Sequence, residues 1–162
     1  MGMTSQYKIL DDHELETILS SPRLIEDILF PEQDDDPFKG QVSLGKEWHS
    51  IHYILCECLE TDGSLDSEVV LGGVEIGPDL GYGPARIFKA SKVTEIADVL
   101  ESVKFVELAT DVVVEEEVKS QIYGGFNQDR GIIEQQYLLF RQLSKLFGEA
   151  AKNNKAVLTY FS

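Results

Sequence analysis

The stretch from Lys46 to Leu59 carries most of the side chains in this chain that could do chemistry. It holds the only Trp, two of the three His and both Cys. At about 100° per residue, a helix over this stretch places Trp48 and His52 on one broad apolar face. A histidine on such a face can serve as a general base or a metal ligand, but it is also a common core residue bonded to a backbone carbonyl.

The same stretch raises the question of a metal site. His49, His52 and Cys56 have i, i+3, i+7 spacing and could converge on one side of a helix. Zinc takes four protein ligands, or three and a water, and no residue stands out as a fourth ligand. We therefore expect no metal and no cofactor, with a zinc site at these three residues as a lesser alternative.

The two cysteines indicate the cellular compartment of the protein, and we do not expect them to form a disulfide. Cys56 and Cys58 lie two positions apart in the expected helix, so their side chains should point to opposite sides and not bridge. Two reduced thiols are typical of a cytoplasmic protein.

A second candidate region is the glycine-rich segment from Gly81 to Arg86. It lacks the Gly-Lys-Ser/Thr of a phosphate loop, and Pro84 removes one backbone donor. Arg86 could hold a carboxylate or phosphate in bidentate fashion, or pair with a local acid or stack on Tyr82. A candidate pocket would place His52 as base and Arg86 as anion clamp, with Tyr82 and Trp48 as walls.

The charge is the strongest signal in the composition. Fourteen basic and twenty-nine acidic residues give a net charge of −15. Such a field repels nucleic acid and anionic membranes and favours association with basic proteins. No apolar run approaches the ~20 residues of a membrane span. A plain acidic, soluble surface is the other interpretation.

Hydrophobic periodicity predicts the elements that position these residues. Asp11 and Glu14 form a capping-box pattern that should start a helix. The residues predict one α+β domain over 1–162, with a small, mostly antiparallel sheet that includes both terminal strands and packs against several helices. The expected strands are 7–10, 69–71, 86–89 and 156–161; the expected helices are 11–19, 22–29, 46–59, 91–100, 103–121 with a break near Thr110, and 131–152; the expected loops are 32–40 and 72–84.

Several segments together resemble a known family, the YfbM-like bacterial proteins of Domain of Unknown Function 1877. The resemblance covers most of the chain and implies a compact α+β fold and a soluble bacterial protein, with no established activity to carry over. Gly124 and Phe126 stand where such proteins often have Pro and Trp. The resemblance is carried by Met1-Gly2-Met3, Lys46-x-Trp48-His49-x-Ile51-His52-Tyr53-x-Leu55, Leu80-Gly81-Tyr82-Gly83-Pro84-Ala85-Arg86, Val93 to Leu100 and Ile122-Tyr123-Gly124.

Two functional hypotheses follow. The first is a non-catalytic protein-binding factor, immunity-like or regulatory, whose acidic surface engages a basic partner protein. Its basis is the strong negative charge and the lack of an assembled catalytic signature. The second is an enzyme or small-ligand binder that uses the candidate pocket of Trp48, His52, Tyr82 and Arg86.

Overall fold

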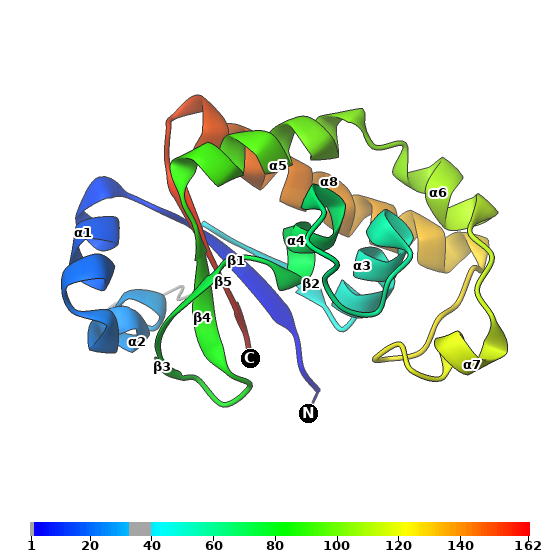
Figure 1. The fold of residues 1–162 in the computed structure, drawn as a ribbon, viewed down its shortest axis with the longest axis horizontal. Helices are drawn as coiled ribbons and strands as arrows, with labels where there is room; N and C mark the ends of the chain where they lie inside the picture. Colours follow the sequence, from blue (N-terminus) through cyan, green and yellow to red (C-terminus); the bar gives the residue numbers. More distant parts are fainter. Residues whose placement is uncertain (1, 33–39) are drawn as a thin grey trace.

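Five strands form one antiparallel sheet, which runs through the middle of the molecule (Figure 1). A computed structural model describes residues 2–32 and 40–162. The strands lie in the order β2-β1-β5-β4-β3. Their bounds are β1 Ser5–Leu10, β2 Gln41–Gly45, β3 Val74–Asp79, β4 Pro84–Phe88 and β5 Ala156–Phe161. The two terminal strands pair at the centre, from Ser5 opposite Phe161 to Leu10 opposite Ala156. The predicted α+β class with both terminal strands in the sheet is therefore confirmed.

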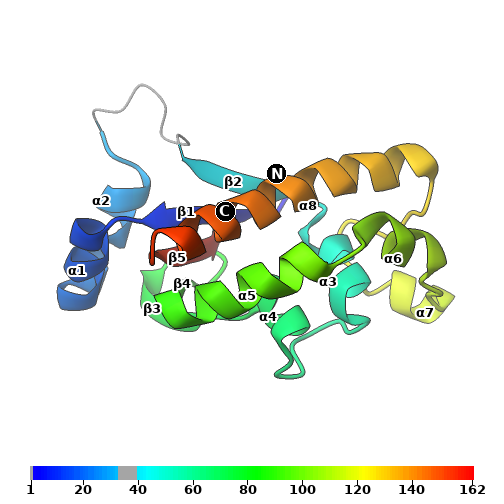
Figure 2. The same cartoon turned by 90° about the horizontal axis from the view of Figure 1, so that it is seen from above.

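The helices lie on both faces of this sheet, and Figures 1 and 2 show the division. Their bounds are α1 Asp12–Ser20, η1 Pro22–Leu24, α2 Ile25–Leu29, α3 Trp48–Cys56, α4 Leu65–Leu71, α5 Ala90–Ser102, α6 Phe105–Asp111, α7 Glu116–Lys119 and α8 Arg130–Lys152. The first three cover one face. The others gather on the opposite face, where α5 and α8 lie along the sheet and α3, α4, α6 and α7 extend beyond it.

The larger core lies between the sheet and α8. Phe147 of α8 is fully buried and meets two aromatic rings of the sheet edge-to-face. Its ring centroid lies 5.9 Å from that of Tyr7 in β1 and 5.8 Å from that of Phe88 in β4. Aromatic pairs in this geometry add about 0.5–1.5 kcal/mol each beyond the area that they bury. Phe147 therefore joins the long helix to two strands at once.

A smaller core fills the other face. Alternation along β5 divides its side chains, because Val157 joins the larger core while Leu158 and Tyr160 join the smaller one. Ile18 of α1 and Ile25 of α2 complete this layer. A strand buried on both faces explains why the C-terminal segment is apolar at nearly every position.

Helix α8 is long but strongly amphipathic. Ile133, Phe140 and Phe147 are buried at helical spacing, whereas Glu134 and Arg141 face solvent. The prediction of a helix over 131–152 is confirmed. Within residues 2–32 and 40–162, no helix is long and apolar enough to cross a membrane.

Other predictions had mixed outcomes. The Asp11–Glu14 capping box is present, with the Glu14 amide donating to Asp11 Oδ1 over 2.7 Å. The expected helix 103–121 breaks where predicted, into α6 and α7. The strand expected at 69–71 is wrong, because these residues end α4. The loop expected over 72–84 is partly wrong, because Val74–Asp79 forms edge strand β3. Residues 33–39 of the loop expected over 32–40 lie outside the described part of the chain.

Two misses have physical causes. Edge strand β3 reads as a loop because Gly77 and Pro78 interrupt it. Gly77 adopts φ +81°, and a Cβ there would lie 2.9 Å from the Pro22 carbonyl, so close approach to η1 requires glycine. Strand β2 is short and carries Ser43 and Gly45, which weaken its pattern.

The Phe147 contact gives a test of the larger core. We expect Phe147→Ala to lower the free energy of unfolding by about 3–5 kcal/mol, because it leaves a cavity against Tyr7 and Phe88. Leu138→Ala, on the same helix at 58% exposure, should change it by less than about 0.5 kcal/mol. Urea denaturation of both variants measures the difference. Equal losses would show that α8 is not anchored through Phe147.

Candidate functional site

The predicted helix over 46–59 ends earlier than expected, and its end shapes the site. Helix α3 runs from Trp48 to Cys56, and Glu57 then adopts the left-handed conformation with φ 54°. The Glu57 amide donates to the Tyr53 carbonyl over 2.7 Å, which closes the last turn. Residues 58–60 therefore fold back beside α3.

Two histidines, one turn apart on α3, hold this returning segment. His49 Nε2 lies 2.9 Å from the Leu59 carbonyl oxygen, and His52 Nε2 lies 3.0 Å from the Glu60 carbonyl oxygen. Both rings are buried. A carbonyl oxygen only accepts, so each Nε2 must carry the proton and donate it.

The remaining ring nitrogens differ in a way that matters for chemistry. His49 Nδ1 accepts the Tyr123 amide over 2.8 Å, so both of its ring nitrogens are engaged. His52 Nδ1 carries the lone pair in this tautomer and lies 3.9 Å from the Cys56 sulfur. Burial lowers the pKa of His52 below its usual value, while the bond to Glu60 opposes that shift. His52 is therefore a neutral ring, and His49 is not placed to bind a metal.

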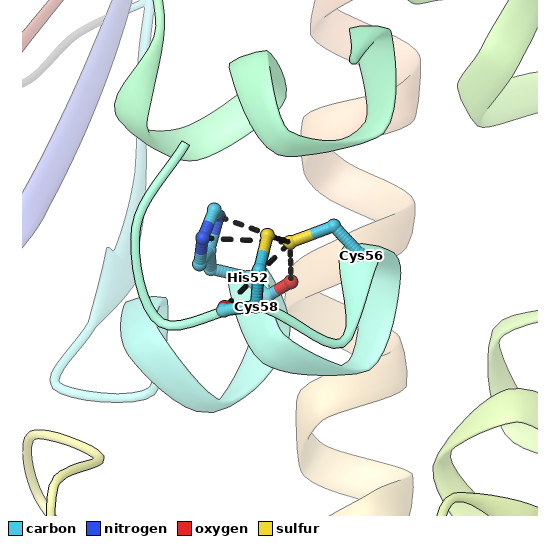
Figure 3. Close-up of side chains that lie close together, drawn as sticks. All are labelled: His52, Cys56 and Cys58. Carbon is cyan, nitrogen blue, oxygen red and sulfur yellow. Dashed lines mark hydrogen bonds between the residues drawn. The ribbon is translucent and has the colours of Figure 1, made fainter. Parts of the chain in front are cut away.

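The prediction that the two thiols point apart is wrong. Cys58 lies beyond the end of α3, and the left-handed residue between them brings the sulfurs to 2.7 Å (Figure 3). Cys56 Sγ also lies 3.5 Å from His52 Nε2 and donates to the His52 carbonyl over 3.2 Å. Burial and the Cys58 thiol raise the pKa of Cys56 to about 12. Without a cation, this thiol is neutral and is not an activated nucleophile.

Trp48 is fixed in the core rather than free to form a pocket wall. Its indole nitrogen donates to the Met3 carbonyl over 3.2 Å. Its ring stacks on His49 with centroids 4.6 Å apart, and it packs against Tyr123 and Phe161. The side chain is 5% exposed.

Arg86 and Tyr82 occupy a different region, at the β3–β4 hairpin. Arg86 donates to the Gly72 carbonyl over 2.8 Å and to the Val70 carbonyl over 3.2 Å, which closes the C-terminal end of α4. A cation at that end also interacts favourably with the helix dipole. Its guanidinium lies 5.3 Å from the ring centroid of Phe161. Tyr82 is half exposed at the tip of the hairpin.

The glycine segment is a tight turn rather than an open cradle. The Leu80 amide donates to the Gly83 carbonyl over 3.0 Å, and Asp79 Oδ1 accepts the amides of Gly81 and Gly83 at 2.7 and 3.1 Å. A carboxylate thus already occupies the donors that an anion would use.

The contacts of the four candidate pocket residues divide them into three groups. Trp48 and Arg86 both contact Phe161, so the structure links these two through one ring. His52 contacts the cysteines, and Tyr82 projects from the hairpin. None of the four lines any of five surface hollows of about 270–650 Å³ among the described residues. A shared pocket stays a prediction.

Sequence reasoning missed a groove beside α6, which we call the α6 groove. Its volume is about 560 Å³, and α3, the end of α5 and α6 form its walls. The floor is apolar and the exposed rim carries three carboxylates and one ammonium. The lining residues are Ile54, Leu55, Glu57, Ser102, Val103, Lys104, Glu107, Leu108, Asp111 and Val112.

Comparison with known proteins places the chain in a family. The model for Domain of unknown function (DUF1877) matches residues 1–160. The chain belongs to the DUF1877 family. This confirms the resemblance found in the sequence, while no curated protein matches the chain.

A solved structure shares the fold of this DUF1877 chain. It is the crystal structure of YfbM from Escherichia coli, titled a protein of unknown function. The TM-score is 0.73 at 18% identity, over 98% of this chain and 99% of that one. At this identity the likeness shows the fold alone, so function has to be argued from the residues above.

The buried His52 gives a pH test in reduced, metal-free protein. Its lowered pKa means that the unfolded chain takes up the proton first as pH falls below about 6.5. The free energy of unfolding should therefore decline from pH 7 toward pH 5. His52→Gln retains a donor for Glu60 without titrating, so its curve should decline less. Denaturant unfolding across this range measures both slopes, and parallel curves would contradict the assignment.

Proposed function

We propose that this DUF1877 protein binds a basic, amphipathic segment of a partner protein in the α6 groove and performs no catalysis. The observation that carries the proposal is the composition of the groove, an apolar floor beneath an acidic rim. The net charge of −15 has the same sign as this rim.

The apolar part of the groove suits leucine- or valine-sized side chains. Ile54 and Leu55 form its buried base, and Leu108 is 41% exposed at its side. A bound helix typically inserts anchors spaced at i, i+3/i+4 and i+7 into such a groove. Burying these anchors would stabilise the complex by about 25 cal/mol for each Å² of apolar surface removed from water.

The polar part of the groove determines which charge the partner segment should carry. The rim carries three carboxylates, those of Glu57, Glu107 and Asp111, and one ammonium group, that of Lys104. All four side chains are exposed. A partner with Lys or Arg beside its apolar anchors would meet these carboxylates. Charges at the rim of an interface raise the association rate and the salt dependence more than the final affinity.

The other side of α6 borders a different hollow. Val106, 45% exposed, lines that hollow together with Arg130 and Glu134. Other hollows fit a basic partner less well, because the one between α5 and α8 carries Arg141 and Lys145.

The alternative, an enzyme or small-ligand binder, needs His52 and Arg86 at one cavity. In this fold, His52 Nε2–H donates a hydrogen bond to a backbone carbonyl. Two guanidinium nitrogens of Arg86 also donate to backbone carbonyls. These bonds explain both residues as structural, so protein binding accounts for more of what is observed.

A matched pair of variants tests the proposal. Glu107→Gln/Asp111→Asn removes two rim carboxylates, and Glu16→Gln/Glu26→Gln removes two exposed carboxylates of α1 and α2, at the far end of the molecule (Figure 1). The probe is a labelled helical peptide with leucines on one face and lysines on the other, followed by fluorescence anisotropy. We expect the groove variant to bind about fivefold more weakly or worse, and the distal variant to bind like the wild type.

Salt and peptide charge provide the controls. Binding should weaken as salt increases, and a peptide with glutamates in place of lysines should not bind. An equal loss in both variants would mean that the peptide senses only the overall charge. That result, or equal binding of the acidic peptide, would reject the α6 groove as the docking site.

A further inference from the structure

A second site is separate from the α6 groove. His52, Cys56 and Cys58 place one potential ligand atom each within 4.8 Å of one another (Figure 3). We propose that these three residues bind a single thiophilic d¹⁰ cation of the zinc class, with a fourth position open to water. The set differs from the one considered in the sequence, because Cys58 takes the place of His49.

The spacing of the donors is close to that of tetrahedral zinc. With Zn–S near 2.3 Å and Zn–N near 2.0–2.1 Å, a nitrogen and a sulfur ligand lie about 3.5 Å apart. Cys56 Sγ lies 3.9 Å from His52 Nδ1, the ring nitrogen that would bind the cation, so these two atoms must approach by about 0.4 Å. His52 and Cys56 are one helical turn apart, so α3 itself fixes this edge of the site.

The bond from His52 to Glu60 is the arrangement that a metal-binding histidine needs. Ligating histidines almost always donate the other ring N–H to a carboxylate, carbonyl or water, which fixes the ring and its tautomer. Here Nε2–H is held by the Glu60 carbonyl, and Nδ1, 3.9 Å from Cys56 Sγ, retains its lone pair. The outer partner is therefore in place before any cation arrives.

A second adjustment concerns the two sulfurs. The two sulfurs lie 2.7 Å apart, whereas two thiolates on one zinc lie about 3.7 Å apart. Cys58 lies in the segment after α3, and both cysteines are only half-buried. Rotation of the Cys58 side chain can open this edge without moving the helix.

The donor set selects the class of ion. Thiolates with an imidazole favour zinc-class and cuprous ions over calcium or magnesium, which prefer oxygen. Binding exchanges two thiol protons for one divalent cation, so both protons go to solvent and the site remains neutral without redox change. The carboxylate of Asp62 lies near enough to interact with Cys56 and His52, which further favours a cation.

Cobalt provides the direct test, because tetrahedral Co²⁺–thiolate complexes absorb visibly. Full-length protein, reduced and freed of metal, is titrated with CoCl₂ and then with ZnCl₂. We expect one equivalent of Co²⁺, a sulfur-to-cobalt charge-transfer band with tetrahedral d–d bands, and complete displacement by Zn²⁺. This spectrum on the unmodified chain needs no variant to fold.

Variants then assign the ligands. Cys56→Ser and Cys58→Ser should each remove the charge-transfer intensity of one thiolate and weaken zinc binding at least a hundredfold. His52→Gln should weaken it tenfold or more, and His13→Gln, at an exposed histidine of α1, should have no effect. Circular dichroism confirms that each variant is folded.

Three outcomes would overturn the proposal. The first is a titration with no charge-transfer band. The second is a His13→Gln variant that loses binding as His52→Gln does. The third is a thiol assay of the unfolded, unreduced protein that finds no free thiols, since a Cys56–Cys58 disulfide would then be the native state of the pair.

Discussion

The rest of the site depends on two imidazoles that hold a returning chain. His49 and His52 stand one turn apart on α3 and donate to the carbonyls of consecutive residues, Leu59 and Glu60. A buried ring that donates to a carbonyl satisfies two polar groups that would each cost about 1–3 kcal/mol unpaired. Glu57 accepts a left-handed conformation so that both bonds can form. Because the chain turns back at Glu57, Cys58 lies beside Cys56 and Glu57 lies at the rim of the α6 groove.

The same interactions connect α3 to distant parts of the chain. His49 Nδ1 accepts the Tyr123 amide, while the Tyr123 hydroxyl accepts the Met3 amide over 2.7 Å. Trp48 donates to the Met3 carbonyl and packs on Phe161, so both chain ends meet at this helix. A helix fixed on so many sides is a rigid support for the groove on one side and the Cys–His cluster on another. Both histidines hold the returning segment, and His52, the two cysteines and the carboxylates of the groove are the groups available for binding.

Local patterns predicted the parts of the fold that are locally determined. The capping box at Asp11, the long stripe of α8 and the apolar strand at 156–161 each follow from short-range rules, and each is present. The end of α3 could not be predicted in this way, because left-handed residues at helix ends are usually Gly or Asn and Glu57 is neither. A helical wheel through 59 therefore placed Cys58 on the wrong side. The α6 groove forms only when α3, α5 and α6 meet, so no single segment indicates it.

The tautomers of the two histidines test this account most directly. Long-range ¹H–¹⁵N NMR correlations on reduced, metal-free protein distinguish a protonated Nε2 from a protonated Nδ1. The account predicts that the ring proton of both His49 and His52 is on Nε2, and that both of these protons exchange slowly with solvent. A proton on Nδ1 of either ring, or rapid averaging of the two tautomers, would show that the carbonyls of Leu59 and Glu60 are not held as described.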